Sequence, residues 1–141
     1  MKETKTKITV KTTVNVPVEK VWDAWTKPEH ITKWNHASDD WHTIRAENEL
    51  IVGGKFLSRM EAKDGSFGFN FSGTYDEVQT QKNIVFTLDD SRKVEVTFVS
   101  CDNTTEIIET FEAESENSIE LQQQGWQAIL DNFKKYAEGI V

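Results

Sequence analysis

The chain of 141 residues is 37% hydrophobic and 28% charged, which fits a single globular domain built on one core. Its formal net charge of −8 argues against nucleic acids and anionic membranes as partners, because these polyanions repel an acidic surface. With a single cysteine, no signal-peptide pattern in residues 1–7 and no run of ~20 apolar residues, the protein is expected to be cytoplasmic and not inserted in a membrane.

The first third of the chain predicts one strand followed by two short helices. Apolar and polar residues alternate over residues 5–16, which is typical of a half-buried strand. Pro17 suits the first turn of a helix, and an apolar stripe follows at helical spacing: Val18, Val21, Trp22 and Trp25. Pro28 interrupts this pattern and predicts a second short helix that carries Ile31 and Trp34.

The middle of the chain predicts a series of β-strands, because its hydrophobic pattern repeats every second residue. Six strands are expected: Asp40–Asn48, Lys55–Ala62, Phe67–Val78, Ile84–Leu88, Lys93–Cys101 and Thr105–Phe111. Turn-forming residues separate them, among them Gly53-Gly54 and Asp64-Gly65. Since these connections are short, neighbouring strands must pair as antiparallel hairpins.

The last predicted element is a long helix over residues 118–138. Large apolar residues fall on one face: Ile119, Trp126, Ile129, Leu130, Phe133, Tyr136 and Ala137. Asn117 followed by Glu120 indicates an amino-terminal cap, and Gly139 indicates the end of the helix. Such a helix needs a wide apolar surface to lie on, and the preceding strands supply one.

The order of these elements predicts an α+β domain that occupies residues 1–141. A curved antiparallel sheet of about seven strands would wrap around the long carboxy-terminal helix, with two short helices after the first strand, as in the helix-grip fold. A sheet that curves around one helix leaves a hollow between them unless side chains fill it. The two short helices would lie near one mouth of that hollow.

Several runs of residues resemble a known superfamily. They are residues 16–26 with Pro28-Glu29-His30, then Gly53-Gly54-Lys55-Phe56, residues 71–78, and Gln124-Gly125-Trp126 followed by Ile129-Leu130. Their order and spacing resemble the START-like, or SRPBCC, superfamily. Within it they resemble the branch named after the carboxy-terminal domain of the activator of a heat-shock chaperone's ATPase. The resemblance covers essentially the whole chain.

This resemblance implies a fold with a cavity, and it does not imply one reaction. Related members include lipid carriers, polyketide cyclases and aromatases, hormone receptors, pollen allergens and the co-chaperone itself, so the fold leaves the function open. The expected partner is a small apolar, aromatic or lipid-like molecule, and no cofactor is expected. The co-chaperone carries a separate amino-terminal module for which 141 residues leave no room, so a chaperone contact in a stress response is kept as the third hypothesis.

The candidate ligand-binding residues are mainly aromatic. Phe67, Phe69, Phe71 and Tyr75 share one face of a predicted strand by parity, and Gly73 leaves space among them. They form either the wall of a pocket or ordinary core. The full candidate set is Trp34, Trp41, Phe56, Phe69, Phe71, Tyr75, Gln122, Trp126, Ile129 and Phe133. Gln122 interrupts the apolar face of the long helix, so it either reaches a ligand or lies in a first turn exposed to solvent.

The candidate polar groups are Asp40, His42 and Arg59. Asp40 and His42 lie in a loop rich in His and Asp whose spacing matches no zinc motif, so a metal site is not predicted. They are either solvated or, with the two Trp residues, part of a gate at the mouth of the cavity. Arg59 either anchors a ligand carboxylate or forms an exposed charge pair with Glu61. An acidic run that includes Glu106, Glu109 and Glu112 is interpreted as a mostly solvated face.

Three functions remain open at this point. The first is binding of a small, mostly apolar ligand between the sheet and the long helix. The second is a cyclase- or hydrolase-like enzyme that uses His42, Asp40, Arg59 or Tyr75 as acid–base groups in the same cavity, although no nucleophile, phosphate-loop or dinucleotide motif is present. The third is the chaperone contact. The first is favoured because aromatic residues are abundant, with five Trp and eight Phe.

Overall fold

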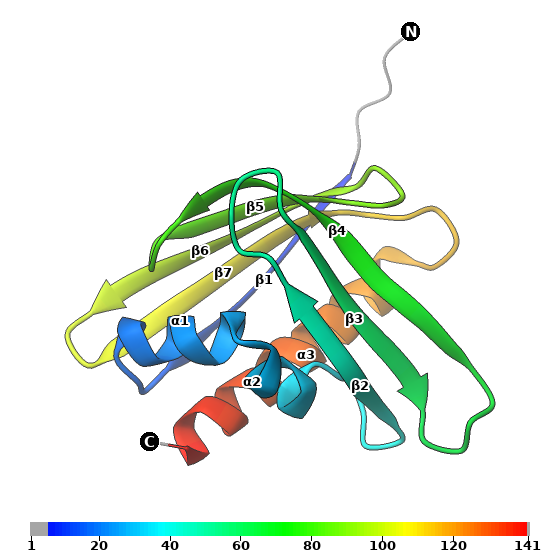
Figure 1. Cartoon of the computed structure of the whole chain (residues 1–141), viewed down its shortest axis with the longest axis horizontal. Helices are drawn as coiled ribbons and strands as arrows, with labels where there is room; N and C mark the ends of the chain where they lie inside the picture. Colours follow the sequence, from blue (N-terminus) through cyan, green and yellow to red (C-terminus); the bar gives the residue numbers. More distant parts are fainter. Residues whose placement is uncertain (1–5, 141) are drawn as a thin grey trace, which may run out of the picture.

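Seven antiparallel strands form one sheet that curves over the long carboxy-terminal helix (Figure 1). The computed structural model describes residues 6–140. Its elements in chain order are β1 (Lys7–Val14), α1 (Val18–Thr26), α2 (Pro28–Trp34), β2 (Trp41–Asn48), β3 (Lys55–Ala62), β4 (Gly68–Gln79), β5 (Asn83–Leu88), β6 (Lys93–Cys101), β7 (Thr104–Glu112) and α3 (Ile119–Gly139). None of the three helices in this part of the chain is long and apolar enough to cross a membrane.

The strand order in the sheet is β1-β7-β6-β5-β4-β3-β2, and every neighbouring pair is antiparallel. The strands from β2 to β7 follow one another as hairpins, and β1 pairs with β7, so the first strand lies beside the last. The predicted helix-grip fold is confirmed. The predicted bounds of β3 and β6 match the observed ones. Those of β2 and β5 differ by one residue at the start, and those of β4 and β7 by one residue at each end. Residue 5, at the start of the first predicted strand, lies outside the described residues.

The start of α3 differs from the prediction. Ser118 caps the helix, because its Oγ accepts a hydrogen bond from the backbone N–H of Leu121 at 3.1 Å, so the predicted cap at Asn117 is wrong by one residue. Ile119, predicted on the buried face, is 44% exposed, whereas Gln122 is buried. The buried face of α3 therefore starts about one turn later than predicted, at the polar Gln122. Gly139 is the last helical residue, and Ile140 follows as the cap.

An aromatic cluster lies where α1, α2 and the second half of α3 contact one another. Figure 1 shows these helices on the same side of the sheet. The rings of Trp25, Trp34 and Phe133 lie 4.8–4.9 Å apart in all three pairs, and Trp25 also contacts Phe98 of β6. The indole N–H of Trp34 donates a hydrogen bond to the carbonyl oxygen of Ala24 at 2.8 Å, so the buried polar atom of this ring is satisfied.

Gly73 marks the place where β4 approaches β5 and the ring of Phe56 most closely. A Cβ atom at this position would lie 2.5 Å from the carbonyl oxygen of Thr87 and 3.0 Å from Cε1 of Phe56. The space that the sequence suggested at Gly73 is therefore taken up by the neighbouring strand and ring, and the residue is glycine because no side chain fits.

We expect Gly73→Ala to lower the free energy of unfolding by about 1–3 kcal/mol, because the added methyl group has to push apart a backbone carbonyl and a packed ring. Urea unfolding followed by tryptophan fluorescence measures this change. Gly125→Ala is the matched control: no atom lies within 4 Å of its added Cβ, so alanine in this helix should raise stability by about 0.5–1 kcal/mol. A Gly73→Ala protein as stable as the wild type would contradict the proposed packing.

Candidate functional site

A cavity of about 290 Å3 lies between the concave face of the sheet and the helices. Strands β2 to β5 and β7 contribute its floor, α1 and α2 one end, and Trp126 and Ile129 of α3 its cover. Of the predicted ligand-binding residues, seven line this cavity: Trp34, Phe56, Phe69, Phe71, Tyr75, Trp126 and Ile129. The local reason is strand parity, since alternate residues of β3 and β4 face the same side of the sheet.

Aromatic rings form most of the wall. Phe56 lies at the centre of it, with its ring centroid 4.9 Å from that of Phe86, 5.4 Å from Tyr75 and 5.8 Å from Phe71. On the helix side, the indole of Trp126 stacks on the ring of Phe111 at 3.8 Å, with 10° between the ring planes. These contacts hold the wall in one arrangement without filling the space that it encloses.

Phe69 lies at the outer edge of the cavity, where it is 40% exposed. Its ring contacts that of Trp41 at 5.9 Å, and Trp41 in turn contacts Phe67 at 6.0 Å. Trp41, predicted as part of a gate, therefore touches a residue of the cavity rim and does not itself line the cavity. Phe67 is 64% exposed at the end of the strand, beyond the wall that parity predicted.

Gln122 and Phe133, two further candidates, lie elsewhere. Gln122 is buried, but its carboxamide is fully used by the connection between β7 and α3. Its Oε1 accepts from the N–H of Glu114 at 2.9 Å, and its Nε2 donates to the carbonyl oxygens of Glu114 and Asn117 at 3.1 and 2.9 Å. Phe133 is fully buried in the aromatic cluster with Trp25 and Trp34. Neither side chain reaches the cavity.

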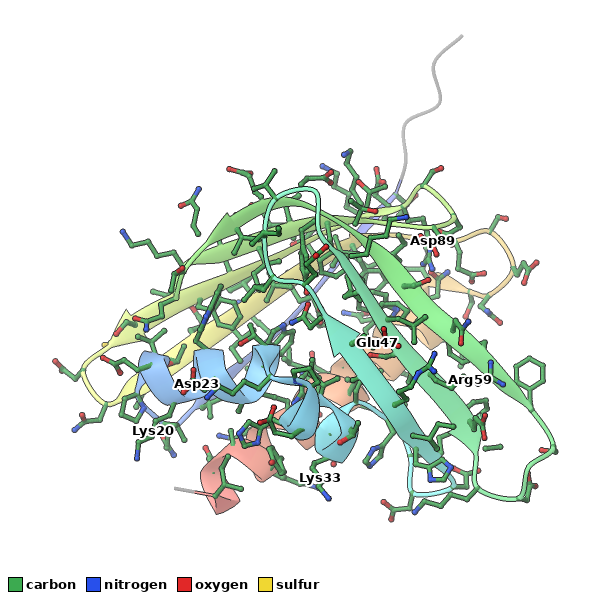
Figure 2. The ribbon with its side chains drawn as sticks, in the orientation of Figure 1. Lys20, Asp23, Lys33, Glu47, Arg59 and Asp89 are labelled. Carbon is green, nitrogen blue, oxygen red and sulfur yellow. The ribbon has the colours of Figure 1, made fainter. Side chains whose placement is uncertain are left out.

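The three polar candidates also lie outside the cavity. Asp40 is exposed in the loop before β2 and accepts a hydrogen bond from Ser38 at 2.5 Å, while His42 is half-buried on β2. Arg59 faces the convex side of the sheet, because its neighbours Ser58 and Met60 face the cavity (Figure 2 labels Arg59). Its Nε lies 2.9 Å from Oε2 of Glu61, which fits the charge-pair interpretation. Within residues 6–140, no three His, Cys, Asp or Glu side chains are grouped as metal ligands would be.

Two hydrogen-bonded pairs supply polar atoms to the wall. The Tyr75 hydroxyl donates to Oδ1 of Asn48 at 2.5 Å, and Nδ2 of Asn48 donates to the carbonyl oxygen of Thr26 at 2.6 Å. Burial raises the pKa of Tyr75 and outweighs the opposite effect of its hydrogen bond with Asn48, so the phenol stays protonated. At the other pair, Nδ2 of Asn35 donates to Oγ of Ser58 at 3.2 Å.

The interpretation of Glu109 as part of a solvated acidic face is wrong, because this residue is buried. It lies on the interior strand β7, opposite Val10 of β1 and Val96 of β6, and its side chain lines the cavity at 8% exposure. Within residues 6–140, no hydrogen bond or ion pair to this carboxyl is formed. Burial raises the pKa of Glu109 from 4.5 to about 8, so the carboxyl is largely protonated at neutral pH. Strand parity could have indicated this burial, because Glu109 shares a face of β7 with Ile107 and Phe111, which are both fully buried.

The remaining titratable groups of the cavity are engaged elsewhere. Glu47 is exposed on β2, where Figure 2 labels it, and its carboxylate lies 3.2 Å from Nε of Arg45. Arg92 is held by Asp90, whose Oδ2 lies 2.8 Å from Nε, and by the carbonyl oxygen of Glu112. Consequently, no hydrogen bond joins two of the titratable side chains that line the cavity, namely Glu47, Tyr75, Arg92 and Glu109.

Comparisons with known proteins agree with this architecture. Residues 15–138 match the family described as Activator of Hsp90 ATPase homolog 1-like protein. The comparison with curated proteins gave no match.

Solved structures extend the likeness to nearly the whole chain. The solution structure of an AHSA1-like protein from Aeromonas hydrophila is 45% identical with a TM-score of 0.90, over 96% of this chain and 94% of that one. A solution structure from Cytophaga hutchinsonii is 50% identical with a TM-score of 0.82, over 95% of this chain and 93% of that one. A crystal structure from Chromobacterium violaceum shares the fold at 20% identity, with a TM-score of 0.84 over 94% of this chain and 98% of that one.

The raised pKa of Glu109 predicts an unusual dependence of stability on pH. Below pH 4.5 the carboxyl is protonated in both states, but between pH 4.5 and about 8 only the unfolded chain ionises it. Glu109 should therefore lower the free energy of unfolding by about 1.4 kcal/mol for each pH unit in this window. Urea unfolding at pH 5, 6.5 and 8 measures the free energy of unfolding of the wild type and of Glu109→Gln. The value for the variant should rise relative to that of the wild type as the pH rises.

Glu47→Gln is the matched control for this series, because Glu47 lies at the same cavity but is exposed. Its stability should follow that of the wild type at all three pH values. Parallel curves for the wild type and Glu109→Gln would show that Glu109 ionises normally in the folded protein.

Proposed function

The chain belongs to the family of Activator of Hsp90 ATPase homolog 1-like proteins, and from this premise we propose that it binds a small, mostly apolar ligand in the cavity between the sheet and α3. The observation that carries the proposal is a space of about 290 Å3 walled mainly by aromatic and aliphatic side chains. Pre-formed cavities of this chemistry, with a few polar groups in the wall, are typical of small-molecule sites.

The energetics of packing support this function. Protein interiors are normally close-packed, and an unfilled apolar space forfeits dispersion contacts on every side. An apolar guest would restore these contacts and would remove its own surface from water, at roughly 25 cal/mol for each Å2 buried. The rings of Phe56, Phe71 and Trp126 would contribute most of the contact area.

The other two functions receive less support. An acid–base enzyme would need two titratable groups close together in the cavity, whereas Asp40, His42 and Arg59 lie outside it and Tyr75 is bonded to Asn48. A chaperone contact would need a contiguous exposed patch, and it rests here on the family's name alone. The cytoplasmic location and the role in a stress response stay predictions.

We expect the neutral fluorescent probe N-phenyl-1-naphthylamine to bind with an increase in fluorescence. Ile129→Trp should weaken this binding by at least ~10-fold, because the larger side chain occupies the space under α3. A fluorescence titration measures the dissociation constant of each protein, and the thermal midpoint shows whether the variant is folded.

Gln124→Trp serves as the control, because it adds the same ring on the exposed face of the same helix and should bind the probe as the wild type does. Ser58→Leu, on the opposite wall, repeats the test from a second element. Binding that is unaffected by both Ile129→Trp and Ser58→Leu would place the probe elsewhere and would contradict the proposed site.

A further inference from the structure

We propose that the ligand is a hydrophobic amine, held in the cavity as a cation against the carboxylate of Glu109. This inference rests on the proposed function and narrows it to one class of ligand. The observation behind it is one unpaired acidic side chain inside a cavity with mostly apolar walls.

Glu109 has no partner for its carboxyl among residues 6–140. Glu109 is more than nine-tenths buried, its side chain lines the cavity, and within residues 6–140 neither a hydrogen-bond donor nor a cationic side chain is bound to its carboxyl. Its strand neighbours Val10 and Val96 are apolar and fully buried. Burying a carboxyl without a partner is costly, and the cost is relieved when an opposite charge with a hydrogen-bond donor is supplied. An ammonium group on a ligand supplies both.

The walls of the cavity around this carboxyl are mainly aromatic. Trp126 stacks on Phe111, which lies two residues from Glu109 on the same face of β7, and Phe56, Phe71 and Tyr75 form the adjoining wall. The faces of aromatic rings attract cations, and the attraction is larger where water is excluded. Aromatic rings around the carboxylate of Glu109 therefore favour a cation over a neutral molecule of the same shape.

The charged groups that face the cavity favour a cationic ligand over an anionic one. Besides Glu109 they are Glu47, Tyr75 and Arg92, and the guanidinium of Arg92 is already held by Asp90 and by the carbonyl oxygen of Glu112. A ligand carboxylate would thus enter beside two acidic groups and find the one cationic side chain engaged. The net charge of −8 likewise draws cations, and repels anions, at the mouth of the cavity.

Three probes that share a naphthalene ring test the inference on the wild-type protein: 1-naphthylmethylamine, 1-naphthylmethanol and 1-naphthoate. Isothermal titration at pH 7 should give at least ~10-fold tighter binding for the amine than for the alcohol, with the acid weakest. Because Glu109 is largely protonated before binding, the amine should release about one proton, seen as a dependence of the heat on the buffer's ionisation enthalpy. The alcohol should release none.

Glu109→Gln should lose at least ~10-fold of its affinity for the amine and all of the proton release, while its affinity for the alcohol changes by less than ~3-fold. Glu47→Gln, which removes the same charge from the rim of the cavity, should keep the preference for the amine. If Glu109→Gln does not fold, the order of the three probes and the proton release of the wild type decide the question.

The possible failures are distinct. An alcohol that binds the wild type as tightly as the amine would overturn the inference and leave the proposed function standing. A wild type that prefers naphthoate would also overturn it and would point to Arg92 instead. Binding of none of the three probes would contradict the proposed function, and the inference with it.

Discussion

The way in which α3 is held against the sheet determines the rest of this structure. Its second half is fixed in solid core, where Leu130 and Phe133 are fully buried, and Phe133 packs against Trp25 and Trp34. Its first turns are fixed by Gln122, which ties the helix to the preceding connection, and by Trp126, which stacks on Phe111 of β7. Because the helix is anchored at both ends, it cannot settle onto the centre of the sheet, and the cavity persists between the anchors.

This anchoring explains why one acidic residue can remain unpaired inside the domain. Glu109 lines the cavity that α3 covers, and within residues 6–140 no hydrogen bond or ion pair holds its carboxyl. Burial of this carboxyl lowers the stability of the fold. Buried polar groups that destabilise the fold are found preferentially at functional sites. The aromatic wall and the acidic group are thus two parts of one arrangement.

Much of the fold could be predicted from the sequence, because short connections and period-two patterns are local properties. The cap of α3 was predicted one residue too early. Asn117 and Ser118 both offer a suitable oxygen, and only the backbone geometry distinguishes them. The aromatic part of the cavity followed from parity on β4. For Arg59 two alternatives stayed open, because parity alone does not say which side of β3 faces the cavity, and the structure agrees with the charge pair with Glu61. Glu109 was interpreted as solvated because it is charged, although its shared parity with Ile107 and Phe111 indicates a buried position. Whether Gln122 meets a ligand or a loop depends on long-range packing that no local pattern contains.

The pairing of β1 with β7 has a consequence for how the chain reaches this state. The hydroxyls of Thr9 and Thr110, on these two strands, lie 3.0 Å apart although 101 positions separate them in the chain. During synthesis the leading strand leaves the ribosome long before its partner exists, and it must remain unpaired until β7 emerges. Closing so large a loop makes the contact order high and folding slow. In the meantime, the apolar side chains of the leading strand are exposed to other nascent chains, which is where a misfolding event would begin.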